Sequence, residues 1–276
     1  MSANIPILFG GHSFISASGN EPRPGDEEMA EIVSVCLDQG ISAFDTTYQP
    51  ERIRCAEVLE RLGRRHEADL IVWNFFGNFG LDEKIEAKLE PYRPDHLNLL
   101  QDQCRTNHID SVVVHLVRDE VANRRQLELV CSWKEAGHVG KIGLWSPPVD
   151  PAVKLSTYRI DFMTETWRYS TQDPDIPLVF NAAKKMGWIT HATSPFRRGW
   201  DLDEFVESAK ESIKETDQAL RALLASYLVR YSFSLPCVDK VIIGMRKAAH
   251  VKTNIESWRK GPLTSAELKT LSTVRG

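Results

Sequence analysis

The segment Ile41–Arg52 holds an acid and a phenol three residues apart, Asp45 and Tyr48. The apolar run Ile41–Phe44 is typical of a buried strand, and a helix is predicted to begin near Pro50. A carboxylate and a phenol at the C-terminal end of a strand are groups with which a β/α barrel builds a catalytic site. The alternative is that Asp45 caps a polar turn and Tyr48 packs beside it. These few residues leave both interpretations open.

Other groups that can transfer protons lie near the ends of predicted strands. His12 follows the first strand, His115 ends the fourth, and Glu165 lies near the end of the sixth. A carboxylate and an imidazole together can act as an acid–base pair. Asp45, His115 and Glu165 are also candidate ligands for a divalent metal, but they occur singly and without ligand spacing, so we predict no metal site. His191 falls deeper on the seventh strand, where we expect a core histidine with its hydrogen bonds satisfied.

Three tryptophans, Trp73, Trp145 and Trp167, also stand at or near the ends of predicted strands. Such side chains can stack on a sugar or an aromatic substrate, although plain packing is the commoner role of tryptophan at these positions. We take His12, Trp73, Glu165 and Trp167 as candidate residues of a substrate pocket.

The segments that must position these residues alternate between short apolar runs and helical stretches. One such helix has the apolar stripe Met29, Ile32, Val33 and Cys36. A long helical segment is predicted over residues 202–233, and a partly irregular helical region ends at Asn107. The predicted strands are Pro6–Phe9, Ile41–Phe44, Leu70–Trp73, Ser111–His115, Lys141–Trp145, Asp161–Trp167, Trp188–Thr193 and Lys240–Gly244.

Runs this apolar indicate a parallel sheet that is buried on both faces. Eight strand–helix units are the number that closes a barrel. The main alternative, an open doubly wound sheet, is disfavoured because no GxGxxG motif follows the first strand. We therefore predict an α/β fold with a single (β/α)8 TIM barrel domain over residues 1–276.

The composition excludes several classes of function. The chain has 276 residues, 26% of them charged and 42% hydrophobic, with a formal net charge of −4, so a dedicated nucleic-acid-binding protein is not expected. No apolar run approaches the ~20 residues of a membrane span, and the N-terminus lacks the pattern of a signal peptide. Five scattered cysteines suit free thiols in a reducing compartment. We expect a cytoplasmic protein that binds a small-molecule substrate.

Five segments, in chain order, resemble motifs of the aldo-keto reductase superfamily. Phe44–Tyr48 (FDTTY) resembles the motif of the second strand, and Ile109–His115 (IDSVVVH) resembles the one that ends in the active-site histidine. Gly137–Leu144 (GHVGKIGL) resembles the signature of the fifth strand. Ala192–Gly199 (ATSPFRRG) and Val241–Glu256 (VIIGMRKAAHVKTNIE) are similar to the stretches that contact the pyrophosphate and the adenosine phosphate of the cofactor.

The resemblance implies hydride transfer between a nicotinamide cofactor and a carbonyl carbon. In the family, a tyrosine protonates the alkoxide, a lysine paired with an aspartate lowers the pKa of that tyrosine, and a histidine orients the carbonyl. Asp45 and His115 match the family positions. Tyr48 matches the tyrosine if the loop has a short deletion, and otherwise Pro50 stands there. Asn74 occupies the position of the lysine, and an amide has no charge with which to lower the pKa of a phenol.

The resemblance also implies a site for NADP(H) or NAD(H), with altered contacts. Trp145 and Ser146 replace the pair that binds the nicotinamide amide. Thr164 replaces a glutamine, and Thr193 replaces the aromatic side chain that stacks on the nicotinamide. Arg246 and Lys247 suit a 2′-phosphate, although they fit two solvated charges at the start of a helix equally well. The remaining expected cofactor contacts are Ser194, Gly199, Gly244, His250 and Asn254.

Three hypotheses for the function follow. The first is a divergent NAD(P)H-dependent carbonyl reductase that uses Asp45, Tyr48 and His115. The second is a barrel without a nicotinamide cofactor that performs acid–base chemistry, as a lyase, isomerase or dehydratase, on a polar or sugar-like molecule. The third is an inactive ligand-binding protein. We expect an open substrate site, covered by Asp201–Ser208 or Gly77–Asp82 or completed by a second subunit of a homo-oligomer.

Overall fold

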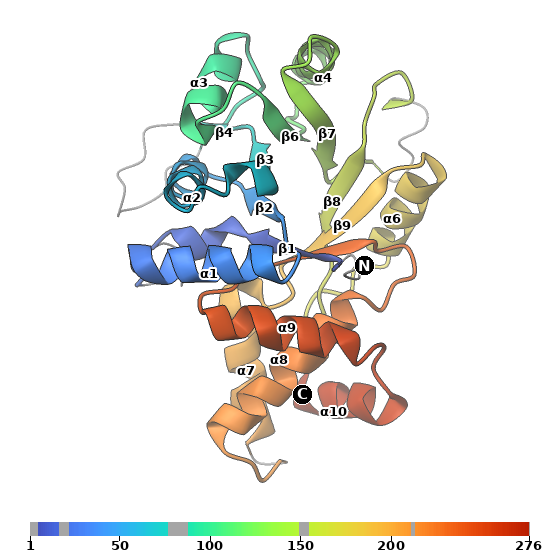
Figure 1. The fold of residues 1–276 in the computed structure, drawn as a ribbon. Helices are drawn as coiled ribbons and strands as arrows, with labels where there is room; N and C mark the ends of the chain where they lie inside the picture. Colours follow the sequence, from blue (N-terminus) through green and yellow to red (C-terminus); the bar gives the residue numbers. More distant parts are fainter. Residues whose placement is uncertain (1–4, 17–21, 77–87, 149–154, 211–212, 276) are drawn as a thin grey trace.

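Eight parallel strands close into a barrel at the centre of the molecule (Figure 1). The computed structural model describes residues 5–16, 22–76, 88–148, 155–210 and 213–275. Around the barrel the strands follow the order β1-β10-β9-β8-β7-β6-β3-β2. Their bounds are β1 Ile7–Gly10, β2 Ala43–Thr46, β3 Asp69–Trp73, β6 Ile109–His115, β7 Val139–Trp145, β8 Phe162–Thr166, β9 Ile189–Thr193 and β10 Lys240–Ile243. The predicted α/β barrel is confirmed.

Helices pack around the outside of the barrel and bury their apolar stripes against it. In α1, Met29, Ile32, Val33 and Cys36 are all buried, as their helical spacing predicts. Gly40 ends this helix with a φ of +86°, a left-handed conformation that favours glycine. The helices are α1 Asp26–Asp38, α2 Gln49–Arg61, α3 Asp95–Cys104, α4 Glu120–Glu135, α6 Asp175–Lys185, α7 Trp200–Ala209, α8 Asp217–Ser232, α9 Ala248–Arg259 and α10 Ser265–Arg275, with short 3-10 turns η1 Gly11–Phe14, η2 Arg65–Glu67 and η3 Arg197–Gly199.

The interior of the barrel is a packed core of its own. Side chains alternate between the two faces of a strand, and one set of alternate positions forms a separate hydrophobic cluster. Gly143 lies on the same face of β7, and a Cβ there would lie 2.2 Å from the ring of Phe162. The Phe162 ring therefore fills the interior where β7 has no side chain. The cluster consists of Leu8, Ile71, Trp73, Val113, Phe162 and Ile242.

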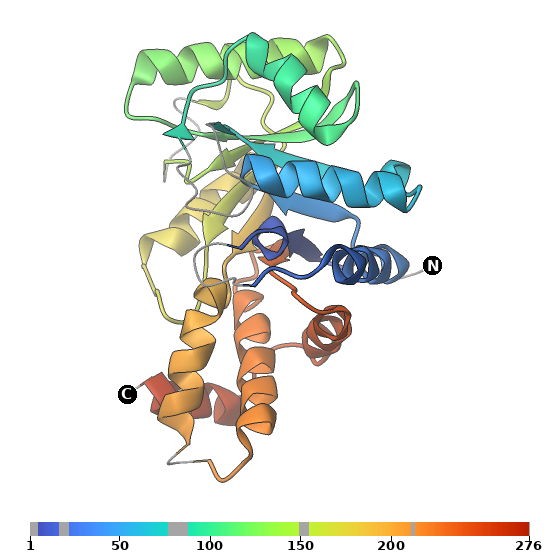
Figure 2. The ribbon, with the colours of Figure 1, turned by 90° about the vertical axis from the view of Figure 1, so that its left-hand side faces the viewer.

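A second hydrophobic cluster lies beside the barrel, where α7, α8 and α10 pack together (Figures 1 and 2). The prediction of one helical segment over residues 202–233 was wrong, because α7 ends at Ala209 and α8 begins at Asp217. Thr216 caps α8 by accepting a hydrogen bond from the amide of Ala219 at 3.2 Å. The expectation that Asp201–Ser208 covers the site as a loop was also wrong, since these residues form most of α7.

The region between β3 and β6 differs from its prediction as well. After Trp73 the chain forms β4 Phe75–Phe76, which pairs antiparallel with β5 Lys88–Leu89. The helical region predicted up to Asn107 is limited to α3, which starts after Pro94. The proposed covering segment Gly77–Asp82 lies outside the described residues.

Two further expectations concern the whole chain. The cysteines are free thiols, and all but Cys131 are buried, which agrees with the prediction. Among the described residues, no helix has the length and apolar character needed to cross a membrane.

Candidate active site

Four inward-facing side chains meet at the C-terminal end of the barrel, which we call the mouth. They are Asp45 of β2, Trp73 of β3, His115 of β6 and Trp145 of β7. Asp45 lies beside Ile71 in the β2–β3 register, and His115 lies beside Trp145 in the β6–β7 register. Parallel strands thus bring together residues that are far apart in sequence. Asp45 is next to the last residue of β2, so it lies near the strand end as predicted, although the strand runs on to Thr46 and does not stop at Phe44.

The carboxyl group of Asp45 is buried and has a neutral hydrogen-bond partner. Trp73 Nε1 donates to Asp45 Oδ1 over 2.6 Å, and Asp45 is only 7% exposed. Burial raises the pKa of Asp45 to about 7, against the lowering effect of the Trp73 hydrogen bond. The nearby charge of Glu51 raises it further, and His12 lowers it. Asp45 can therefore hold or release a proton near neutral pH.

Aromatic rings connect the residues around the mouth. Trp73 packs on Trp145 with centroids 5.2 Å apart, and Trp145 meets the ring of His115 edge-on at 6.2 Å. Phe75 lies 5.6 Å from His115 and 5.5 Å from Tyr48. These contacts give the mouth a largely aromatic lining, to which Asp45 and the imidazole of His115 add polar groups.

His115 presents a neutral imidazole to this lining. Burial lowers its pKa from the usual 6.5. Its Nδ1 is buried and has no hydrogen-bond partner among the described residues. A buried polar atom without a partner is costly, and such atoms are found where a ligand supplies the missing bond.

Asn74 lies away from Asp45, on the outer side of β3. Its amide oxygen accepts from the amide of His115 at 2.9 Å, and its amide nitrogen donates to the carbonyl of His115 at 3.0 Å. The same nitrogen donates to the carbonyl of Glu90 at 3.1 Å and lies 3.3 Å from Gln126 Oε1. Asn74 thus fixes the backbone of His115, and the side chain beside Asp45 is that of Trp73.

Tyr48 and His12 lie together at the rim of the mouth, and a residue missed in the sequence, Glu51, holds them there. Glu51 is fully buried, and its Oε2 accepts from the amides of Thr47 at 2.8 Å and Tyr48 at 3.3 Å. Its Oε1 lies 2.7 Å from Nδ1 of His12, whose ring stacks on Tyr48 at 5.3 Å. The signal in the sequence was an acid three residues into α2, the position from which a glutamate binds the first amides of a helix.

Glu165 and Trp167 lie outside the mouth. They alternate with the inward position Thr164, and Glu165 accepts hydrogen bonds from Ser146 Oγ and from the amide of Thr166. Burial raises the pKa of Glu165, although these two hydrogen bonds act to lower it. Trp167 is buried and stacks on Tyr231 at 5.6 Å. Of the four candidate pocket residues, only His12 and Trp73 are at the mouth.

Among the described residues that were expected to hold the nicotinamide, Thr164 has a buried hydroxyl without a hydrogen-bond partner. Thr164 is 1% exposed, and its Oγ1 has no partner within the described part of the chain. Ser146 and Ser194 have φ angles of +47° and +64°, conformations that are costly for residues other than glycine and cluster at functional sites. Thr193 Oγ1 lies 3.5 Å from Ser194 Oγ. The Ser146 hydroxyl is held by Glu165.

A cluster of positive charge surrounds the start of α9, which follows β10 at the same end of the barrel. Lys247 is the N-cap residue, and Arg246 donates to the carbonyl of Pro22. Burial and the charges of Lys247, Arg221 and Arg246 lower the pKa of His250. The free amides of a helix N-terminus together with basic side chains form an anion site. Gly244 is exposed ahead of this helix, Asn254 is buried on it, and Gly199 begins α7 in a left-handed conformation.

His191 is a core residue, as predicted, but one of its nitrogens is unsatisfied. It stacks on Phe162 inside the barrel at 4.8 Å and is 4% exposed. Its Nδ1 has no partner among the described residues. Burial, followed by the charge of Lys240, lowers its pKa to about 3, so the ring is neutral.

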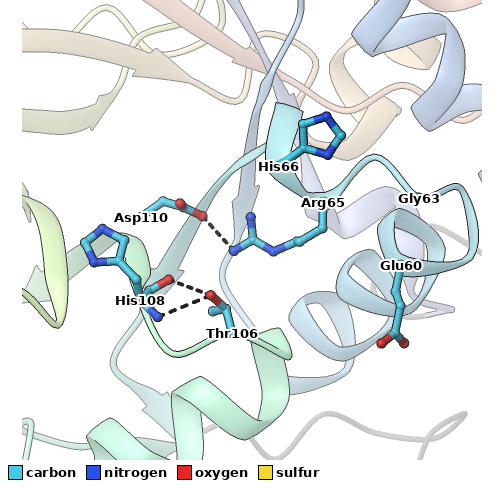
Figure 3. A pocket seen from close by; sticks show the side chains of 7 residues that line it. All are labelled: Glu60, Gly63, Arg65, His66, Thr106, His108 and Asp110. Atoms are coloured by element: carbon cyan, nitrogen blue, oxygen red, sulfur yellow. Dashed lines mark hydrogen bonds and ion pairs between the residues drawn. The ribbon is translucent and has the colours of Figure 1, made fainter.

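A surface hollow of about 490 Å³ lies at the other end of the barrel, before β3 and β6 (Figure 3). In it Arg65 pairs with Asp110 at 2.8 Å, and Asp110 also accepts from the amide of Leu70 at 2.9 Å. These contacts join η2 to two strands, so the charged side chains here have a structural role. The lining residues are Glu60, Gly63, Arg65, His66, Thr106, His108 and Asp110.

Comparison with known proteins agrees with this fold. The model of the aldo/keto reductase family matches residues 6–275. An aldo-keto reductase from Bacillus halodurans in its holo form superposes with a TM-score of 0.69 at 19% identity, over 98% of this chain and 91% of that one. The glycerol dehydrogenase of Gluconobacter oxydans gives a TM-score of 0.68 at 14% identity, over 98% and 90%. No curated protein sequence matches the chain.

Proposed function

We propose that this chain, which belongs to the aldo/keto reductase family, is an NADP(H)-dependent oxidoreductase that interconverts a small carbonyl compound and its alcohol at the mouth. Family membership supports an oxidoreductase-like activity. The observation that carries the choice of cofactor is the basic cluster at the start of α9, at the same end of the barrel as Asp45 and His115. A 2′-phosphate would account for this concentration of positive charge.

The residues present fit such a cofactor at both of its ends. Arg246, Lys247 and His250, with the first amides of α9, would hold the adenosine phosphate. Thr164 Oγ1 is a buried hydrogen-bonding group without a partner in the described part of the chain, and it would bind the nicotinamide amide. When bound, the cofactor supplies or accepts the hydride.

The protein side chains would orient the substrate and handle its proton. The neutral imidazole of His115 can donate a hydrogen bond to a carbonyl oxygen. Asp45 and Tyr48 are the candidate proton donors. The rings of Trp73, Trp145 and Phe75 would favour a substrate with an apolar or flat face.

Calorimetric titration with NADPH and NADH tests the proposal. We expect micromolar binding of NADPH and weaker binding of NADH, because only NADPH has the 2′-phosphate. Lys247→Ala should weaken NADPH about tenfold and leave NADH unchanged. The control is Lys252→Ala, an exposed lysine on the same helix. An absence of heat with either cofactor at millimolar concentration would rule out the reductase.

A second candidate function is favoured by the state of Asp45. Its buried carboxyl has a pKa of about 7 and forms no ion pair with Lys or Arg among the described residues. Such a group suits general acid–base catalysis without a nicotinamide, as in a lyase, isomerase or dehydratase. Substrate turnover in the complete absence of NAD(P)H, lost in Asp45→Asn, would establish this alternative.

A further inference from the structure

Asp45 and Trp73 form a unit that differs from an ordinary carboxylate site. Asp45 lies on β2, between β1 and β3, and its carboxyl group is buried at the mouth, where its hydrogen-bond partner is an indole nitrogen at 2.6 Å. The charged or titratable groups that act on it are Glu51 of α2 and His12 of η1. These two side chains are hydrogen-bonded to each other. Their effects on the pKa of Asp45 are opposite in direction.

We infer that Asp45 transfers the proton during the reaction at the mouth, and that Trp73 is a positioning residue that holds its carboxyl group in place. The inference rests on the proposed function in taking the mouth as the place of reaction. In this inference the proton donor is the carboxyl group of Asp45, and Tyr48 belongs to the aromatic rim of the mouth.

The indole determines which oxygen carries the proton. The Nε1–H of tryptophan can only donate a hydrogen bond, so Oδ1 of Asp45 accepts from it in both protonation states. The carbonyl oxygen of a protonated carboxyl is a better acceptor than its hydroxyl oxygen, so this hydrogen bond favours the exchangeable proton on Oδ2. The Trp73 ring is itself held by Trp145 at 5.2 Å, and this contact fixes the direction of the N–H.

The burial of the pair explains why a carboxyl can serve as an acid here. Asp45 is protonated at neutral pH to a useful extent because burial raises its pKa to about 7. A general acid works best with a pKa near the operating pH. The Trp73 hydrogen bond acts in the opposite direction and stabilises the carboxylate that remains after proton transfer.

The balanced step in the direction of reduction is as follows. The carbonyl carbon would gain a hydride, with the reduced nicotinamide cofactor as the two-electron donor, and the π electron pair of the C=O bond would move to the carbonyl oxygen. That oxygen forms a bond to the proton of Asp45 Oδ2. The O–H bond of the carboxyl breaks, and its electron pair stays on Asp45 as a carboxylate that accepts from Trp73. A proton from solvent restores the acid, and the oxidation of an alcohol follows the same steps in reverse.

The first test is spectroscopic and requires no substrate or cofactor. In 15N-labelled protein, the indole N–H signal of Trp73, assigned by its loss in Trp73→Phe, should shift with pH about a midpoint near 7. The shift should vanish in Asp45→Asn, while Trp133→Phe, a buried tryptophan on α4, should leave it in place. An indole signal that does not respond between pH 5 and 9 would overturn the inference.

The second test is kinetic and separates Asp45 from Tyr48. With NADPH and a panel of small aldehydes and ketones, Asp45→Asn should lower kcat about 10²–10⁴-fold, and Tyr48→Phe should lower it less than tenfold. Trp73→Phe should move the basic limb of the kcat profile to higher pH by about one unit, because the carboxylate loses a hydrogen bond. Asp95→Asn, an exposed aspartate, is the control.

Failure of the inference can be told from failure of the proposed function. If NADPH binds and Tyr48→Phe abolishes turnover while Asp45→Asn does not, Asp45 is not the proton donor and the reductase stands. If NADPH does not bind but the Trp73 indole titrates with Asp45, the reductase fails and the proton-carrying pair remains.

Discussion

The two ends of the barrel differ in the partners of their aspartates. At the N-terminal ends of the strands, which we call the base, each of four aspartates has a cationic partner. At the mouth, Asp45 has an indole, and His115 Nδ1 and Thr164 Oγ1 have no partner among the described residues. The pairs at the base are Asp69–Lys141, Asp110–Arg65, Asp161–Lys134 and Asp239–Lys184.

Three of the aspartates at the base also bind a backbone amide of a neighbouring strand. Asp110 accepts from Leu70 at 2.9 Å, Asp161 from Ile142 at 2.7 Å and Asp239 from Thr190 at 2.9 Å. Each of them thus joins a helix or turn, through its cation, to the start of a strand. Burial opposes the ionisation of Asp239, but hydrogen bonds from Lys184 and Thr190 outweigh it and lower its pKa.

The base is thus held by ion pairs, whereas the carboxyl group at the mouth has an uncharged partner. At the base, ion pairs join helices and a turn to the starts of the strands. At the mouth, His115 Nδ1 and Thr164 Oγ1 are buried and have no protein partner in the described part of the chain, a feature that is found at functional sites. Barrel enzymes have their active sites at the C-terminal ends of the strands. Among the described residues of this chain, the unpaired His115 and Thr164 atoms lie at that end, and the four aspartate ion pairs lie at the other.

The largest effect we expect is on the stability of Asp45→Asn. The pKa of Asp45 is 3.8 in an unfolded chain and about 7 in the folded one. The folded state thus holds the proton more tightly, and stability falls as pH rises from about 4 to 7. Asn cannot ionise and still accepts from Trp73, so the variant should gain up to roughly 4 kcal/mol above pH 7. Urea unfolding at pH 4, 6 and 8 measures this gain, and an equal difference at all three values would contradict it.

His191 should show the opposite dependence on pH. Its pKa falls from 6.5 to about 3 on folding, so its contribution is complete above pH 6.5 and is lost as the pH falls toward 3. His191→Gln, which cannot be protonated, should be roughly 3 kcal/mol more stable than the wild type at pH 4, relative to their difference at pH 7. Thermal unfolding at the two pH values tests this, and a difference that does not depend on pH would refute it.

At the base, Asp239→Ala should destabilise the fold without changing the chemistry. The variant loses the acceptor for the amide of Thr190 and the pair with Lys184, which is 42% exposed. We expect a loss of about 2 kcal/mol after allowing for solvent screening. Urea unfolding measures the loss, and kcat and KM should stay at the wild-type values. A fall in kcat would mean that the two ends are not independent.

The barrel was predictable because its strands are apolar on both faces and its helices have regular stripes. The position of Asp45 and His115 at strand ends followed from the same pattern. The direction of the Asn74 side chain was not predictable from the resemblance, because a shift of one residue along a strand reverses the face on which a side chain lies. Trp73, one residue earlier, is the inward one. The resemblance placed Asn74 at the position of the family lysine, but it did not indicate which side chains of β3 face the barrel interior.

Other features had too weak a signal in the sequence. The two-residue strands β4 and β5 are too short for a periodic pattern and pair across a long stretch of chain. The indole of Trp73 as a partner for Asp45 depends on the register between β2 and β3, which the sequence does not encode locally. A single domain, a homo-oligomer and a cytoplasmic location stay predictions.

The most direct test of the contrast between the two ends is a carboxyl titration by NMR with 13C-labelled aspartate. Asp45, assigned by its loss in Asp45→Asn, should titrate with a midpoint near 7, and Asp239, assigned in the same way, should titrate below its usual 3.8. Midpoints near 4 for both would contradict the account, because the mouth would then hold an ordinary carboxylate.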